Sequence, residues 1–352
     1  MSRFLAGRLK GLTPYVPGER PDRFTLRLNF NESPYPPPPE VIRAVTEAAG
    51  KANRYADPDC VFLREAIGRV NGLPAECVMA ANGLDQVLYF ALLAFAGPQR
   101  PIQLPEITYT YYDDFIAVLG IPAERKPLRE DFTIDPGDYT APGRMPVIVN
   151  PNAPTGLALS LGALERILKA DPDRPVIIDE AYAGFGADSA LPLIGDHPNL
   201  IVARTLSKGA ALAGARVGYA LGQKEIIAEL ATARSLVDLY GVSAMGQAAG
   251  IAALENWDLV TSCCQRIAAV RDETAASLKA MGCAVLPSLT NFLFVRPPMP
   301  AGAVFDALRE RGVLVRHWEQ PRVRDYLRVS VGTGEEMDRF VAILKEILEG
   351  AK

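Results

Sequence analysis

Histidine and paired cysteine, the commonest ligands of protein-bound zinc, are scarce in this chain of 352 residues. Only His197 and His317 are present, neither in a metal-ligand spacing such as HExxH, so a metal site and a Ser-His-Asp hydrolase are both disfavoured. The five cysteines form an odd set without a CxxC pair, which indicates reduced thiols. His197 lies in the turn-like stretch DHPN, where we expect a solvated side chain.

Long apolar runs and an excess of basic charge are also missing. No window reaches the ~20 apolar residues that span a membrane, and the first ten residues lack the apolar centre of a signal peptide. Lys and Arg number 37 against 41 Asp and Glu, a net charge of −4. We therefore expect a cytoplasmic protein whose partners are small molecules, with neither nucleic acid nor a membrane among them.

Short apolar runs alternate with amphipathic stretches, as in α/β proteins. The runs that read as buried strands are 102–104, 147–149, 176–178 and 200–203. Ser160 precedes a helical apolar pattern over 161–168, which completes a βαβ unit.

The prolines at 36–39 require an extended segment, and helical spacing begins at Glu40. From about residue 287 the pattern predicts strands at 291–295, 313–316 and 327–331, with helices at 302–311 and 335–348. We expect an N-terminal arm that lines a cleft (1–39), a large domain (40–285) and a smaller α/β domain (286–352) to which the N-terminal segment contributes.

Ligands of parallel sheets bind beyond the carboxyl ends of the strands, and polar side chains gather after these runs. Asp179 ends an apolar strand, where a carboxylate needs a cation opposite it. Thr205, Ser207 and Lys208 follow another strand, with Arg216 eight residues beyond the lysine. A carboxylate for a ring cation, hydroxyls and an arginine for a phosphate, and an amine for an aldehyde match the three chemical groups of pyridoxal 5′-phosphate.

Eight segments in this order resemble those of fold type I pyridoxal-phosphate aminotransferases of the histidinol-phosphate aminotransferase group. The segments are LNFNESPY at 28–35, RY at 54–55, ANGLD at 81–85, TY at 108–109, NPNAPTG at 150–156, DEAY at 179–182, TLSK at 205–208 with Arg216, and LRVSVGT at 327–333. The resemblance implies an α/β chain of the PLP-dependent transferase fold type I. Its large domain would contain a mainly parallel seven-stranded sheet, and its smaller α/β domain would be C-terminal.

The resemblance also implies catalytic roles. Lys208 would anchor the cofactor and move the proton, Asp179 would keep the pyridine nitrogen protonated, and Tyr182 would donate to the ring 3′-oxygen. Tyr109 would stack on the ring. The phosphate would lie among Gly83, Leu84, Asp85, Thr205, Ser207 and Arg216.

Tyr55 matches the tyrosine that, in this group, reaches the partner subunit's cofactor phosphate, which implies a homodimer with shared active sites. Four positions depart from the family pattern. Ala153 stands where an asparagine often binds the 3′-oxygen, leaving that task to Asn152 or to Tyr182 alone. Ser33, Leu84 and Gln86 also differ from the commoner residues, which weakens the assignment of the substrate.

Arg328 matches the arginine that binds the substrate carboxylate, as for glutamate or 2-oxoglutarate. Asn31, Arg316 and Tyr15 match other substrate contacts of the group, and the last two favour L-histidinol phosphate, a substrate of histidine biosynthesis. Aminotransfer from aromatic or other amino acids, and a decarboxylase of the O-phosphothreonine kind, remain alternatives. The sequence leaves open whether His317 and Trp318 face the cleft or the core.

Overall fold

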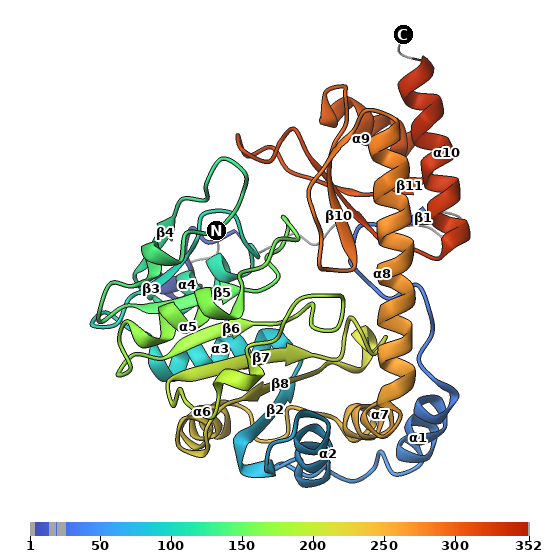
Figure 1. Cartoon of the computed structure of the whole chain (residues 1–352). Coiled ribbons are helices and arrows are strands. Elements are labelled where there is room, and N and C mark those ends of the chain that lie inside the picture. The colour runs from blue at the N-terminus through green and yellow to red at the C-terminus, as the bar shows by residue number, and fades with distance from the viewer. Residues whose placement is uncertain (1–3, 14–18, 20–25, 351–352) are drawn as a thin grey trace.

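The computed structural model describes residues 4–13, 19 and 26–350, and its centre is a sheet of seven strands (Figure 1). Their order is β2-β8-β7-β6-β5-β3-β4, and β8 runs antiparallel to both of its neighbours while the other pairs are parallel. The strands are β2 (Val78–Asn82), β3 (Ile102–Pro105), β4 (Ala123–Lys126), β5 (Met145–Val149), β6 (Val176–Asp179), β7 (Leu200–Thr205) and β8 (Val217–Leu221). The predicted mainly parallel seven-stranded sheet is therefore confirmed.

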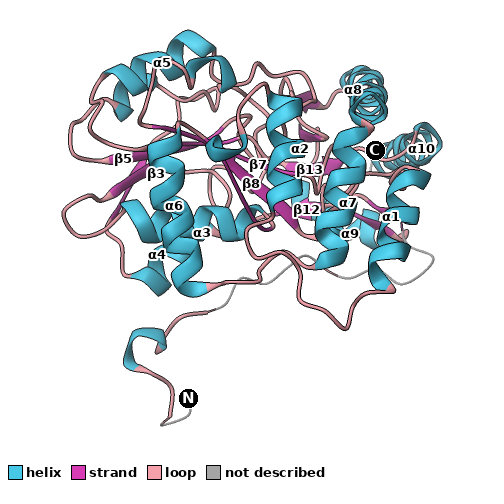
Figure 2. Ribbon diagram, turned by 90° about the horizontal axis from the view of Figure 1, so that it is seen from below, coloured by secondary structure: helices cyan, strands magenta, loops and turns pink. Residues whose placement is uncertain are grey.

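Both faces of this sheet are covered by helices, which explains why its strands are continuous apolar runs rather than alternating ones. Val147, Val149 and Ile177 pack with helices α3 (Leu84–Phe95), α4 (Tyr112–Leu119) and α6 (Lys224–Val237). On the other face, Ile148 and Ile178 pack with α5 (Leu161–Lys169) and α2 (Val61–Asn71). Figure 2 shows the sheet between α5 and the α3, α4 and α6 layer.

A second sheet of four antiparallel strands lies beside the first (Figure 1). Its order is β12 (Arg316–His317), β13 (Leu327–Ser330), β10 (Phe292–Arg296) and β9 (Ala284–Val285). The 24-residue helix α8 (Trp257–Ala280) runs from the large sheet's side of the molecule to this second sheet, where α9 (Ala301–Glu310) and α10 (Gly334–Gly350) also pack. On the lower side in Figure 1, α1 (Pro39–Ala49) lies against α7 (Ala244–Glu255).

Local sequence explains several of these boundaries. The Ser160 hydroxyl accepts a hydrogen bond from the Ala163 N–H and so caps α5, as its sequence predicts. Helix α1 begins at Pro39, the last of the four prolines, where the missing N–H costs nothing. The remaining short elements are the 3-10 helices Gly7–Leu9, Ala75–Cys77, Pro136–Tyr139, Leu191–Leu193 and Ala213–Ala215.

Two expectations differ from the structure. The strand predicted at 313–316 is divided: β11 (Val313–Leu314) pairs with β1 (Leu26–Arg27) in a parallel pair, whereas β12 joins the four-stranded sheet. His197 is only 7% exposed, so the expected solvated side chain is wrong; its turn folds onto α5, with Nε2 3.7 Å from the Glu165 carboxylate. The proposed arm and domain boundaries stay predictions. Among the described residues no helix combines the length and apolarity that crossing a membrane requires.

Candidate active site

A pocket of about 270 Å³ opens where β5, β6 and β7 end and the four-stranded sheet approaches them. Most of the predicted site residues line it: Asn31, Leu84, Asp85, Tyr109, Asp179, Tyr182, Thr205, Ser207, Lys208, Arg216, Arg316 and Arg328. They come from segments up to 300 residues apart in the sequence, so the fold alone brings them together. The pocket lies at the carboxyl edge of a mainly parallel sheet, which is where a ligand site is expected.

Asp179, the last residue of β6, is the buried acid of the pocket, with 1% of its surface exposed. Its carboxylate accepts hydrogen bonds of 3.0 Å from the Tyr112 hydroxyl and from the Ala181 N–H. Burial raises the pKa of Asp179 to about 7, although these two hydrogen bonds oppose the increase. Among the described residues no basic side chain forms an ion pair with this carboxylate, so the cation expected opposite it is left for a ligand to supply.

Lys208 follows β7 and directs its amine into the pocket, where Nζ donates to the Phe30 carbonyl at 3.1 Å. Burial, together with the positive charge of Arg328, lowers the pKa of Lys208 to about 8. A substantial fraction of the amine is therefore neutral slightly above neutral pH. A neutral amine is the form that attacks a carbonyl carbon.

An anion site lies at the start of α3, where backbone N–H groups point out of the helix. Gly83 precedes the helix with φ +83°, and a Cβ there would lie 2.4 Å from Nη2 of Arg216, so the arginine packs directly on the glycine. The Ser207 N–H donates to the Thr205 hydroxyl, which donates to the Ser207 hydroxyl at 2.9 Å. These hydroxyls and the guanidinium surround a space suited to a phosphate.

The Asp85 carboxylate occupies part of this anion site. One oxygen accepts from the Tyr109 hydroxyl at 3.1 Å, and the other lies 3.1 Å from Nη2 of Arg216. The side chain thus holds Tyr109 and Arg216 at the edge of the pocket. The single hydroxyl proton of Tyr109 is directed at Asp85, so a phosphate arriving there would rely on the other N–H groups of the Arg216 guanidinium.

Asn31 connects the two sheets across the pocket. Its Nδ2 donates to the Tyr182 hydroxyl at 2.9 Å, while its backbone N–H and Oδ1 each bond the Ser330 hydroxyl of β13 at 2.8 Å. Asn291 donates to the Asn31 carbonyl at 2.9 Å. With φ at +54°, Asn31 adopts the left-handed conformation that asparagine tolerates better than most residues.

The two predicted substrate arginines lie opposite one another on neighbouring strands, in the register Arg316 with Arg328. Nη2 of Arg328 donates to the Asn29 carbonyl at 2.9 Å. Trp318 is not in the pocket lining, but both guanidinium groups lie near its ring. The ring of His317 instead stacks on Phe305, and its Nε2 lies 2.7 Å from the Arg324 carbonyl.

Three of the predicted residues that the structure describes are not in the pocket lining. Asn152 is buried and its side chain bonds Ile107, Thr155 and Thr108, while Ala153 beside it lines the pocket. Gly83 lies just behind the lining, against Arg216. Tyr55 is 85% exposed and stacks on Tyr240, away from this chain's own pocket. Tyr15 lies outside the described residues.

Sequence reasoning missed three contributors to the site. Tyr112 holds Asp179, the Phe30 carbonyl receives the lysine, and the Asn29 carbonyl receives Arg328. Carbonyl contacts depend on backbone direction and leave no signature in the residue types. Tyr112 was more accessible to prediction, because it is an aromatic residue only three positions after Tyr109, at the start of α4.

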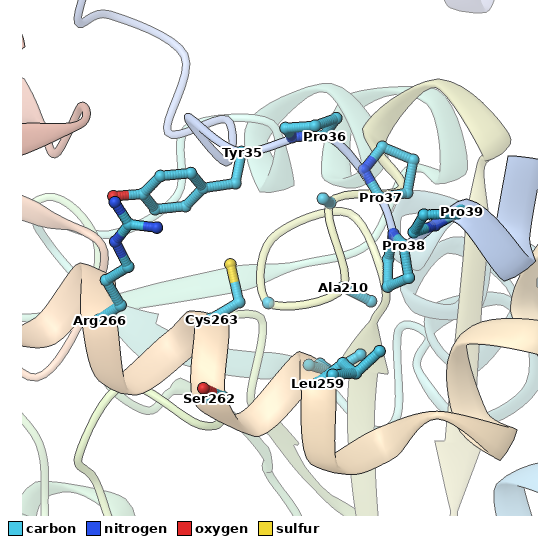
Figure 3. Close-up of a pocket in the computed structure, with 13 residues that line it drawn as sticks. Tyr35, Pro36, Pro37, Pro38, Pro39, Ala210, Leu259, Ser262, Cys263 and Arg266 are labelled. Carbon is cyan, nitrogen blue, oxygen red and sulfur yellow. The ribbon is translucent and has the colours of Figure 1, made fainter.

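A second pocket, of about 380 Å³, lies next to Gly209, Ala210 and Ala211, the residues that follow Lys208 (Figure 3). Its other walls are the proline segment and the first turns of α8, where the Arg266 guanidinium lies 4.3 Å from the centre of the Tyr35 ring. No carboxylate or amine lines it among the described residues. The first pocket is therefore the candidate active site.

A buried carboxylate, a lysine amine of lowered pKa and an anion site in one pocket define an α/β enzyme that captures carbonyl compounds. Comparison of the sequence with protein families gives a match over residues 25–344 to the aminotransferase class I and II family. The chain belongs to this family, and it is an aminotransferase.

Relatives and solved structures agree with this assignment. Histidinol-phosphate aminotransferase 1 of Bradyrhizobium diazoefficiens is 42% identical over 99% of this chain and 100% of its own length. The histidinol-phosphate aminotransferase of Gluconacetobacter diazotrophicus is 43% identical over 99% of both chains. The crystal structure of the Sinorhizobium meliloti histidinol-phosphate aminotransferase in complex with pyridoxal 5′-phosphate has a TM-score of 0.89, with 27% identity over 100% of this chain and 99% of that one.

Proposed function

We propose that this protein is a pyridoxal 5′-phosphate-dependent aminotransferase that transfers an amino group between L-histidinol phosphate and 2-oxoglutarate. The observation that carries the proposal is the meeting of Lys208 and Asp179 with Arg316 and Arg328 in one pocket. The first pair suits the cofactor, and the second pair suits an anionic substrate. Relatives of 42% and 43% identity, each matched over 99% of this chain, are named histidinol-phosphate aminotransferases.

The pocket residues fit the cofactor group by group. Asp179 is a buried carboxylate without an ion-pair partner among the described residues, which suits a protonated pyridine nitrogen. Arg216, Thr205, Ser207 and the start of α3 suit a phosphate. Lys208 lines the same pocket and supplies the amine for an aldehyde.

When bound, pyridoxal phosphate supplies an aldehyde carbon for the donor nitrogen and a ring that accepts electrons from the donor carbon. Asp179, in its ionised form, holds a proton at the ring nitrogen and keeps the ring electron-withdrawing. The Tyr182 hydroxyl, fixed by Asn31, orients the ring through its 3′-oxygen. Nζ of Lys208 takes the proton from the carbon that bears the donor's amino group.

Arg316 and Arg328 select the substrate. A planar guanidinium matches the oxygens of a carboxylate or a phosphate, and two of them on adjacent strands provide enough positive charge for a dianion. L-Histidinol phosphate presents a phosphate there, and 2-oxoglutarate presents a carboxylate. One pair of cations can therefore serve both halves of the reaction.

A half-reaction panel tests this function. Cofactor-loaded enzyme is mixed separately with L-histidinol phosphate, glutamate, phenylalanine, tyrosine and O-phosphothreonine, while the cofactor absorbance and the released products are measured. Fast amino transfer from L-histidinol phosphate and from glutamate is the expected result. Transfer from an aromatic amino acid with inert histidinol phosphate would refute the substrate, and release of carbon dioxide from O-phosphothreonine would refute the reaction type.

We further propose that two chains form a homodimer in which Tyr55 reaches the partner's cofactor phosphate. Tyr55 stacks on Tyr240 with ring centres 4.7 Å apart, and the adjoining segment exposes the apolar residues Leu236, Val237 and Leu239. Large exposed apolar patches of this kind mark interfaces. The patch is also tied to the anion site, because Asp238 accepts a hydrogen bond from Gln86, in the first turn of α3.

Hybrid dimers test the shared site. Tyr55→Phe subunits are mixed with Lys208→Ala subunits, so that a hybrid contains one site with both an intact Tyr55 and an intact Lys208. If the sites are shared, hybrids regain about half of the wild-type activity, more than the mean of the two parents. Hybrid activity equal to that mean would show that each chain completes its own site.

A further inference from the structure

Two like charges face one another on the substrate side of the pocket. Arg316 of β12 and Arg328 of β13 occupy directly opposite positions of an antiparallel pair, and both line the pocket. Like charges in this arrangement repel each other and destabilise the pair. The structure must therefore contain something that keeps the two guanidinium groups close together.

The side chain that holds the two guanidinium groups together is that of Trp318. Its ring centre lies 5.6 Å from Cζ of Arg316 and 5.5 Å from Cζ of Arg328, both within the range of a cation–π contact. The indole is half-buried and packs against the hydrophobic core. This packing, rather than the two arginines, fixes its position. A tryptophan ring is the strongest neutral partner that a side chain offers to a cation.

A second aromatic ring, that of Phe292, contacts Arg328. Phe292, fully buried in β10, lies 5.5 Å from Cζ of Arg328. Arg328 thus lies near two aromatic rings, whereas Arg316 lies near one among the described residues, that of Trp318. Loss of the indole should consequently release Arg316 more than Arg328.

We propose that Trp318 is a positioning residue that holds Arg316 and Arg328 as a single clamp for a dianionic group of the substrate. The inference rests on the proposed aminotransferase site and assigns its specificity to a residue that lies outside the pocket lining. Trp318 touches the two arginines and acts through them. A phosphate ester, whose charge is shared over three oxygens, needs both guanidinium groups at once, while a single carboxylate needs only one.

The substitutions Trp318→Phe and Trp318→Leu separate the aromatic role from simple packing. Phenylalanine keeps a weaker π face, and leucine keeps apolar volume without one. Trp257→Leu is the matched control, because Trp257 is the chain's only other tryptophan, is also half-buried, and belongs to α8 rather than to the pocket.

Inhibition by inorganic phosphate gives the first readout. In the cofactor-loaded enzyme, phosphate competes with the amino donor that the half-reaction panel identifies. Trp318→Leu should weaken phosphate inhibition about tenfold, equivalent to about 1.4 kcal/mol, and Trp318→Phe should fall between it and the wild type. The rate constant at saturating donor should stay unchanged, since the indole contacts neither Lys208 nor Asp179.

Fluorescence gives a second readout that does not require turnover. In the Trp257→Phe holoenzyme, Trp318 is the sole tryptophan, and its emission should change saturably with phosphate but not with acetate at equal ionic strength. An emission response with inert histidinol phosphate would refute the proposed substrate and support the clamp. Equal phosphate inhibition in wild type and Trp318→Leu, or the same weakening in Trp257→Leu, would overturn the role of Trp318.

Discussion

The two walls of the active-site pocket are built in different ways. On the wall of the seven-stranded sheet, Asp179 ends one buried strand and Lys208 follows another, and among the described residues both are held by hydrogen bonds alone. On the wall of the four-stranded sheet, Arg316 and Arg328 rest against aromatic rings, although Arg328 also donates to the Asn29 carbonyl. Ring contacts tolerate small shifts that a hydrogen bond would not.

This difference separates reaction from recognition. The chemistry requires an acid and an amine in one fixed geometry, which strand ends in a covered sheet provide. Substrate choice requires cations that can accept either a phosphate or a carboxylate, which flat guanidinium groups on a smaller sheet provide. Asn31 is the described residue that bonds both walls, through Tyr182 on one side and Ser330 on the other.

The largest effect should come from Lys208→Ala, which removes the amine from the reaction wall. Turnover should fall at least ~10³-fold, the upper range for loss of an acid–base group, while circular dichroism and the arginine wall remain unchanged. Single-turnover kinetics measures the loss, with the exposed surface variant Lys169→Ala as control. Normal turnover in Lys208→Ala would contradict the assignment of the proton transfer.

Asp179→Asn should have the next largest effect. Loss of the charge at the ring nitrogen should lower the transfer rate about 10²-fold or more. The anion site should still bind the cofactor phosphate, and Arg316 and Arg328 should still bind the substrate anion. Stopped-flow absorbance of the half-reaction measures this rate. A variant that loses cofactor but not rate would assign Asp179 to binding alone.

In the cofactor-free protein, Asp179→Asn should also change how stability depends on pH. The folded-state pKa of Asp179, about 7, lies above its ordinary value of 3.8, so the folded state binds this proton more tightly than the unfolded state. The carboxylate therefore costs stability as pH rises from about 4 to about 7, by up to roughly 4 kcal/mol. Asparagine removes that cost, so the melting temperature of Asp179→Asn should gain on the wild type across this window. A pH-independent difference would contradict the raised pKa.

The same contrast explains what the sequence could predict. Apolar runs followed by Asp179 and by Thr205, Ser207 and Lys208 located the reaction wall, because ligands of mainly parallel sheets bind beyond the carboxyl ends of the strands. Strand alternation could not place His317 and Trp318, since the two-residue β12 is too short to define its faces. The contacts of Phe30 and Asn29 are made by backbone carbonyls, which any residue type supplies.

The recognition wall can be tested with Arg328→Lys and Arg316→Lys. Lysine keeps the charge but loses the fork of donors, so KM should rise about 10- to 100-fold with kcat nearly constant. Arg316→Lys should raise the KM of L-histidinol phosphate more than that of glutamate. The doubly charged phosphate group needs both cations, whereas one carboxylate group needs only one. Steady-state kinetics with both substrates measures this ratio. Equal losses for both substrates would show that the arginines do not divide the anions between them.

The smallest expected effect is that of Tyr112→Phe, which removes one hydrogen bond from Asp179 without changing a charge. The Tyr112 hydroxyl lowers the pKa of Asp179 against the effect of burial, so its loss should raise that pKa further above its present value of about 7. More of the acid is then protonated at neutral pH, and cofactor affinity should fall up to about tenfold. Spectroscopic titration of the cofactor across pH should show this deficit shrinking as the solution becomes alkaline.

Tyr139→Phe is the matched control for this last substitution. Tyr139 belongs to the 3-10 helix at 136–139 and is as deeply buried as Tyr112, but its hydroxyl has no hydrogen-bond partner in the part of the chain that the structure describes. Removing it should leave cofactor affinity unchanged at every pH. If Tyr112→Phe followed the same flat profile, the hydrogen bond would position the carboxylate without setting its charge, and the reaction wall would depend on burial alone for the pKa of Asp179.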